Sequence, residues 1–125
     1  MSYAERHTVQ VQTASDGSVT AHTDIVTGEI VNISYVKASS DAFADTVDFA
    51  VTLETSGVGL WTEANVTASK TVAPTQAAHD QAGAGVTFDG TRPVRRPIVA
   101  AGERVQIAVT NGGASKNGTF VVVVA

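Results

Sequence analysis

The chain has 125 residues, of which 43% are hydrophobic, with no cysteine and a formal net charge of −4. This length fits one domain. The missing cysteines exclude disulfides and thiolate metal sites, and the acidic balance argues against a nucleic-acid partner, which needs a basic surface. No stretch approaches the ~20 apolar residues that cross a bilayer as a helix. The N-terminal residues lack a signal-peptide pattern, so we expect no membrane partner and assembly in the cytoplasm of the producing cell.

The N-terminal half predicts strands separated by turns. Residues 1–5 show no pattern and are expected to form a short arm ordered by a partner, with Tyr3 as a partner-binding candidate. Residues 6–125 then form the single domain. Alternation of apolar and polar residues predicts four strands, at His7–Thr13, Val19–Ile25, Ile30–Val36 and Thr46–Thr55.

The middle of the chain is less regular. A shorter strand is expected between Leu60 and Ala68. Thr71–Gly85 has no period and predicts a long irregular loop with room for one helical turn around Ala77–Gln81, and such loops often bind ligands or partners. A short strand at Val86–Phe88 is followed by Arg92–Pro97. The two prolines make that segment extended and confine it to a sheet edge or a connection.

The C-terminal stretch Gly102–Val124 predicts a long hairpin that closes the fold. Its first arm alternates, and its second arm, Thr119–Val124, is apolar on both faces. We therefore expect the second arm to lie deep, covered in part by another subunit. About eight or nine short antiparallel strands at this spacing predict an all-β protein: a single β-sandwich domain of jelly-roll type.

Two blocks of sequence carry a family resemblance. One runs from Val51 to Thr62 and continues through Val72–Gln76 and His79-Asp80. The other runs from Ala100 to Ile107 and is followed by Gly112-Gly113, Lys116 and Gly118–Phe120. Together these blocks, roughly the second half of the chain, resemble small virion proteins encoded among the head genes of tailed bacteriophages. The resemblance implies a capsid decoration (cement) protein that sits on the outer capsid surface and ties capsomers together.

Three groups of residues are candidates for binding. Arg92, Arg95 and Arg96 either pair with acids on the major capsid protein or form a solvated edge that blocks aggregation. Trp61 either anchors an interface, stacks on a sugar, or caps one end of the core, and the core cap is favoured. The oligomer interface is assigned to Val121, Val123 and Phe120, because an apolar outer face is costly in water.

No chemistry-bearing cluster is visible in the sequence. His79-Asp80 stands apart from His7 and His22, and no nucleophile elbow accompanies it. We therefore expect no catalytic residue, no metal site and no cofactor. The leading hypothesis is a non-enzymatic decoration protein, a dimer or trimer, bound to the major capsid protein on the virion surface. The alternative is a carbohydrate- or receptor-binding β-sandwich module of a phage neck, fibre or tail.

Overall fold

The structure, a computed structural model, describes residues 4–125. Nine strands run through these residues: β1 (Glu5–Gln12), β2 (Val19–Lys37), β3 (Asp48–Leu53), β4 (Gly59–Glu63), β5 (Lys70–Val72), β6 (Thr75–Ala77), β7 (Arg95–Pro97), β8 (Val99–Thr110) and β9 (Asn117–Val124). The described part of the chain contains no helix, and so none that could span a membrane. The expectation of a helical turn around Ala77–Gln81 is therefore wrong. β1 begins at Glu5, inside the predicted arm of residues 1–5, and Tyr3 lies outside the described residues.

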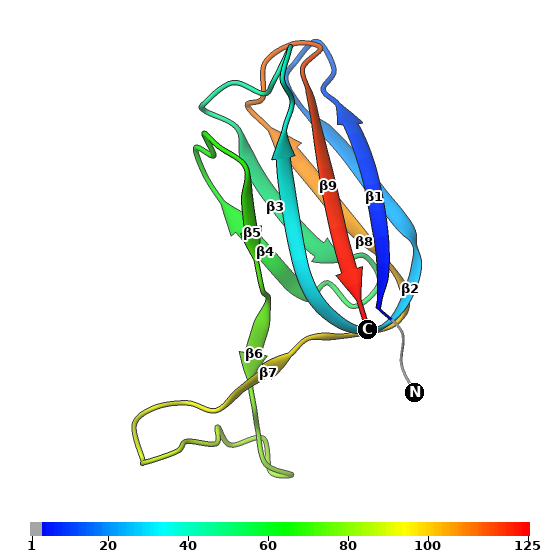
Figure 1. Ribbon diagram of the computed structural model, residues 1–125. Coiled ribbons are helices and arrows are strands. Elements are labelled where there is room, and N and C mark those ends of the chain that lie inside the picture. The colour runs from blue at the N-terminus through cyan, green and yellow to red at the C-terminus, as the bar shows by residue number, and fades with distance from the viewer. Residues whose placement is uncertain (1–3) are drawn as a thin grey trace.

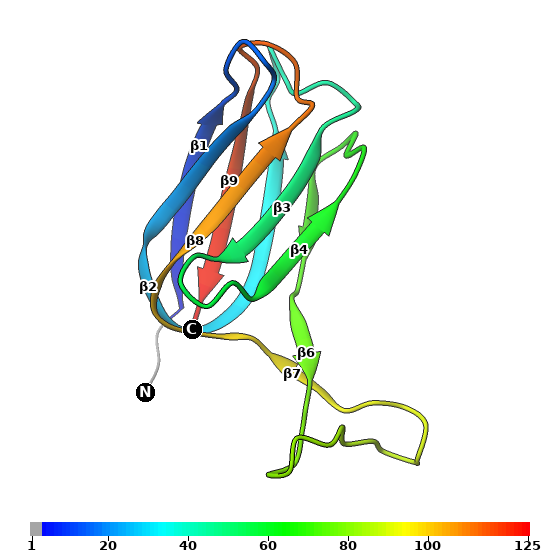
Figure 2. The same cartoon turned by 180° about the vertical axis from the view of Figure 1, so that it is seen from behind.

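The strands form two packed layers with a ribbon projecting from one end (Figures 1 and 2). One layer has the order β1–β9–β2–β5 and the other the order β2–β8–β3–β4, with all neighbours antiparallel. When the two parts of β2 are counted as separate strands, these two strand orders are those of a jelly roll, which is built from two Greek keys. The prediction of a single all-β sandwich is confirmed, although β2 and β8 are not short.

Strand β2 belongs to both layers and joins them. Its first part pairs with β8 from Val19 to Glu29, and its second part pairs with β9 from Ile30 to Lys37. The break expected between the predicted strands Val19–Ile25 and Ile30–Val36 contains Gly28, which lies at the bend between the two parts. Gly28 has a φ of 129°, and a Cβ there would lie 2.6 Å from the carbonyl oxygen of Ala125. The chain does change direction where the sequence predicted a break, but the break is a bend within the single strand β2 and not a loop between two strands.

The C-terminal stretch is not a hairpin. β8 pairs with β2 and β3, whereas β9 pairs with β1 and β2, so the two strands lie in opposite layers. Both strands alternate in burial: Val105, Ile107 and Val109 are buried on β8, and Phe120 and Val122 on β9. The apolar face of each strand lies toward the space between the layers. Because the chain crosses from one layer to the other between β8 and β9, the apolar faces of both strands are buried in the same core.

Aromatic rings fill one end of that core. Phe49 of β3 contacts Tyr35, Phe43, Trp61 and Phe120, with ring-centroid distances between 4.8 and 6.1 Å. Gly118 makes room for the group, since a Cβ at this position would lie 2.5 Å from the Phe43 ring. Tyr35 and Phe120 come from one layer and Phe49 from the other, so these contacts hold the two layers together.

Candidate functional site

The most distinctive surface feature is a projecting arm, residues 75–97. β6 and β7 pair antiparallel with the register Thr75↔Pro97, Gln76↔Arg96 and Ala77↔Arg95. The arm leaves the sandwich at the end where the C-terminus lies (Figures 1 and 2). Its base is fixed by two buried apolar residues, Pro74 and Ile98. Of the stretch Thr71–Gly85 that was expected to be irregular, residues 71–72 belong to β5 and residues 75–77 to β6, whereas residues 78–85 are irregular apart from one bridge between His79 and Gly85.

Beyond β6 and β7 the arm is held by its own backbone. Ala78, Val86 and Val94 form a closed ring: the N–H of Ala78 donates to the carbonyl of Val94, that of Val94 to Val86, and that of Val86 to Ala78, at 2.8–2.9 Å. The chain segments around Ala78, Val86 and Val94 are therefore hydrogen-bonded to one another within the arm. This matters because an extended segment with unpaired backbone groups invites non-specific strand pairing.

Two aspartates shape the turns of the arm. The Asp80 carboxylate accepts hydrogen bonds from the backbone N–H groups of Ala82 and Ala84. Asp89 accepts from the backbone N–H groups of Thr91 and Arg92, and its Oδ2 accepts from the Arg92 guanidinium at 2.8 Å. The backbone N–H of Arg92, followed by its side chain, holds the pKa of Asp89 well below its ordinary value. The Asp89 carboxylate is therefore ionised at neutral pH and holds its turn there.

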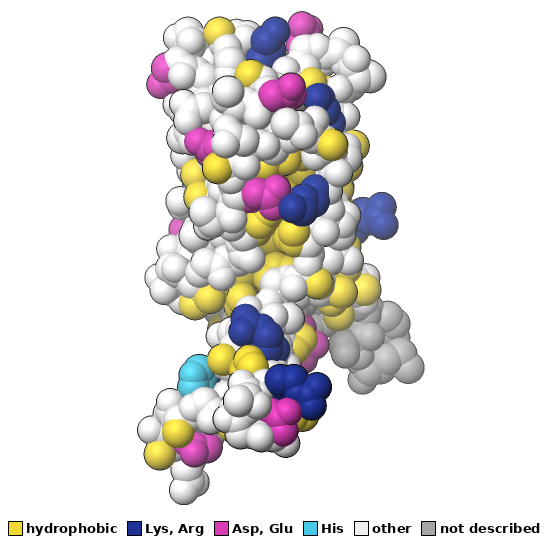
Figure 3. Space-filling model, turned by 90° about the vertical axis from the view of Figure 1, so that its left-hand side faces the viewer, with side chains coloured by type: hydrophobic (Ala, Val, Ile, Leu, Met, Phe, Trp, Pro, Cys, Tyr) yellow, Lys and Arg dark blue, Asp and Glu magenta, His cyan; other side chains and the backbone are white. Residues whose placement is uncertain are grey.

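The three predicted arginines all lie on the arm, but their side chains differ in role. Arg92 pairs with Asp89, and Arg95 donates to the hydroxyl and carbonyl oxygens of Thr75 at 2.8 Å. Within residues 4–125, Arg96 has no side-chain hydrogen bond or ion pair. The prediction that Arg92–Pro97 is an edge or connection fits β7, which pairs with β6 alone. Figure 3 shows the basic side chains of the arm below the sandwich.

The arm and the rest of the protein carry opposite net charges. Three arginines and two aspartates give residues 75–97 a net charge of +1, and the remaining five basic and ten acidic residues give the rest of the chain −5. The arm also holds Phe88, whose side chain is 74% exposed, and the partly exposed Val86. A short strand was predicted at Val86–Phe88, where the structure has only an isolated bridge between Thr87 and Pro93, and the sequence pattern did not single out Phe88 as a binding candidate.

The other predicted site residues lie in or against the sandwich. Trp61 is buried, packs on Phe49 and donates from Nε1 to Glu63 at 3.2 Å, so it is the core cap that the pattern favoured. Phe120 is fully buried in the core, and its assignment to an oligomer interface is wrong. Val121 and Val123 are half-buried on the outer face of β9, between Thr8 and Arg6 of β1 and Ser34 and Asn32 of β2.

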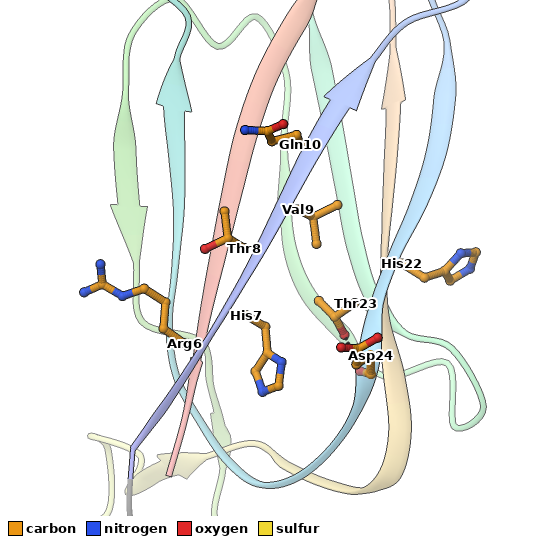
Figure 4. Close-up of a pocket in the computed structure, with 8 residues that line it drawn as sticks. All are labelled: Arg6, His7, Thr8, Val9, Gln10, His22, Thr23 and Asp24. Atoms are coloured by element: carbon orange, nitrogen blue, oxygen red, sulfur yellow. Dashed lines mark hydrogen bonds between the residues drawn. The ribbon is translucent and has the colours of Figure 1, made fainter.

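A cleft of about 380 Å³ lies between β1 and the first part of β2 (Figure 4). His7 and Val9 point toward β2 there, whereas Arg6, Thr8 and Gln10 point to the opposite side of β1. His22 points away from His7, so the two histidines do not converge. In the described residues no group of three or more His, Asp or Glu side chains is arranged to hold a metal.

A charged cluster lies on the outer face of β2, β3 and β8. The Glu54 carboxylate accepts hydrogen bonds from Arg104 and lies 2.9 Å from the Nε2 of His22. The hydrogen bond from Arg104, then the charges of Arg104 and His22, hold the pKa of Glu54 below its ordinary value of 4.5. The cluster joins the end of β3 to the neighbouring strands of the same layer.

The lowered pKa of Glu54 predicts a pH-dependent contribution to stability. A carboxylate with a depressed pKa in the folded state stabilises it above the unfolded-state pKa, and this is lost as the pH falls through the folded-state value. We therefore expect Glu54→Gln to melt below wild type at pH 7, with the difference disappearing below pH 4.5. Thermal melts across this range would show it. Glu29→Gln is the control, since the Glu29 side chain makes no ion pair within residues 4–125. A deficit that does not shrink as the pH falls below 4.5 would contradict the prediction.

Comparison with known proteins leaves the family of this chain open. No protein-family model and no curated protein matches the sequence. A solved structure titled "Crystal Structure of FLHE" aligns over 98% of this chain and 98% of its own, with 9% sequence identity and a TM-score of 0.46. A likeness this weak carries no argument about function.

Proposed function

We propose that this protein is a non-enzymatic decoration protein of a tailed bacteriophage, bound as a homo-oligomer to the major capsid protein on the outer surface of the capsid. The observation that carries the proposal is the preformed arm of residues 75–97, which bears the three arginines. A protein that ties capsomers together has to reach beyond its own body. The backbone of the arm is hydrogen-bonded within the arm, so the arm is already ordered before it binds. It can therefore reach a partner at a small cost in conformational entropy.

The chemistry of the arm fits an acidic protein surface. Arginine offers planar, bidentate donors to carboxylates, and Arg96 is available for such a partner. Trp61, the candidate sugar platform, lies within the core and offers no exposed ring face. The carbohydrate-binding alternative therefore has no observation in its favour, and the capsid role is the function the geometry supports best.

Replacement of Arg92, Arg95 and Arg96 by serine is expected to weaken binding to capsids stripped of this protein by about tenfold or more, equivalent to ~1.4 kcal/mol. The measurement is occupancy by co-sedimentation with capsids, at low and high salt, because a charge-based contact weakens as salt screens it. The loss should therefore be larger at low salt.

Two further variants make this test specific. Arg96→Ser alone leaves the internal bonds of Arg92 and Arg95 intact, so a loss there reflects contact with the capsid and not disorder of the arm. Lys116→Ser, in the β8–β9 loop at the other end of the sandwich, is the matched control for removal of a positive charge. Occupancy that is the same for all four proteins would end the proposed role of the arm.

A further inference from the structure

The arm has the exposure at which proteases usually cut a folded chain. It projects from the sandwich, and residues 79–93 are all exposed (Figures 1 and 2). Exposed segments of this kind are the preferred sites of proteolytic nicking. Serine proteases of the trypsin type cut after arginine or lysine, because an acidic pocket binds that side chain. The three exposed arginines of the arm, Arg92, Arg95 and Arg96, are therefore three candidate cleavage sites.

Two of the three sites are blocked by the residue that follows. Pro93 comes directly after Arg92, and Pro97 comes directly after Arg96. A proline after the bond to be cut makes a tertiary amide with a fixed φ and no N–H group, which trypsin-like enzymes do not accept. The chain has only three prolines, and none of the basic residues outside the arm precedes one. This kind of protection is thus confined to the arm.

The third site, the bond after Arg95, is held by the fold. Arg95 lies in β7 and pairs with Ala77 of β6. Its guanidinium donates from Nε to the hydroxyl oxygen of Thr75 and from Nη2 to the Thr75 carbonyl oxygen, both at 2.8 Å. A protease has to bind this side chain in its pocket and the adjoining backbone in its cleft, so both sets of contacts must open first. The rate of cleavage here therefore follows the small open population of the ribbon.

The two kinds of protection are complementary. Within residues 4–125, the Arg96 side chain makes no hydrogen bond or ion pair, and Arg96 is followed by proline. Arg95 is not followed by proline, and its side chain is bound to Thr75. We infer that the arm resists trypsin-like proteases, so that it presents a free guanidinium outside the sandwich and stays intact where such enzymes are present. This resistance belongs to the free protein and does not depend on the proposed capsid role.

Trypsin digestion of the folded protein, followed by mass spectrometry of the fragments, tests the inference. We expect Pro97→Ala to be cut after Arg96, because that side chain is already free, and the rate of cleavage within residues 75–97 to rise by about tenfold or more over wild type. Thr75→Val weakens the second protection. It should raise cleavage after Arg95 by about fivefold, the effect of one lost hydrogen bond on the open population.

Pro74→Ala is the matched control. Pro74 lies on the other side of the arm base and follows Ala73, so the substitution removes a proline from the base without unblocking a basic residue. It should not produce the fragment that ends at Arg96.

Digestion of thermally unfolded wild type separates the two protections. Trypsin should then cut after Arg95 but still not after Arg92 or Arg96, because the prolines act through the sequence and Thr75 acts through the fold. The inference is overturned if folded wild type is cut within the arm as fast as Pro97→Ala. It is equally overturned if the bond after Arg95 is cut as fast in the folded chain as in the unfolded one.

Discussion

Replacement of Phe49 by alanine is expected to lower the free energy of unfolding by about 3–5 kcal/mol, the cost of truncating a buried aromatic residue. Phe49 is fully buried and touches four other rings, of which Tyr35 and Phe120 are nearest, at 4.8 and 4.9 Å. Those two rings belong to the opposite layer of the sandwich. The substitution therefore opens a cavity at the point where the layers meet, and it removes a large part of the ~5–15 kcal/mol that stabilises a domain of this kind.

Urea unfolding measures this loss, and the fluorescence of Trp61 reports it locally, because Trp61 packs against Phe49 with ring centroids 5.5 Å apart. Phe88→Ala is the matched control. It removes the same side chain from an exposed position on the arm and should change the unfolding free energy by less than about 0.5 kcal/mol. A loss below about 1 kcal/mol for Phe49→Ala would contradict the described core.

Replacement of Glu103 by alanine is expected to cost about 3 kcal/mol, because hydrogen bonds to a charged group contribute about 1.5–3 kcal/mol each. Glu103 of β8 is 8% exposed, and its Oε1 accepts hydrogen bonds from the backbone N–H groups of Thr55 and Ser56, both at 2.9 Å. These donors belong to the turn between β3 and β4. Without the carboxylate they lose their partner, and the turn loses its attachment to β8.

Glu103→Gln separates the hydrogen bonds from the charge. The glutamine amide oxygen can still accept from Thr55 and Ser56, so the cost should fall to about 1 kcal/mol. Glu29→Ala, at an exposed position, should be within about 0.5 kcal/mol of wild type. Urea unfolding of the three variants gives the ranking. If Glu103→Ala is no less stable than Glu29→Ala, the carboxylate does not hold the turn.

The sequence by itself determined the β class and the alternation of most strands. In the predicted strand Thr46–Thr55 the alternating apolar residues are Val47, Phe49, Val51 and Leu53, and all four are buried. A period of two is a local property, because successive side chains of a strand point to opposite faces whatever the partner strand is. The same local logic placed Trp61 in the core and predicted that Arg92–Pro97 would be extended.

Only the tertiary structure decided which strands pair and which apolar residues remain uncovered. A glycine-rich loop between two apolar runs signals a reversal, but it does not say whether the chain turns within a layer or crosses to the other, as it does between β8 and β9. Likewise Phe88 and Phe120 are both phenylalanines in β-prone stretches, yet one is 74% exposed and the other is fully buried. Burial depends on contacts between segments far apart in the chain, and no local pattern contains them.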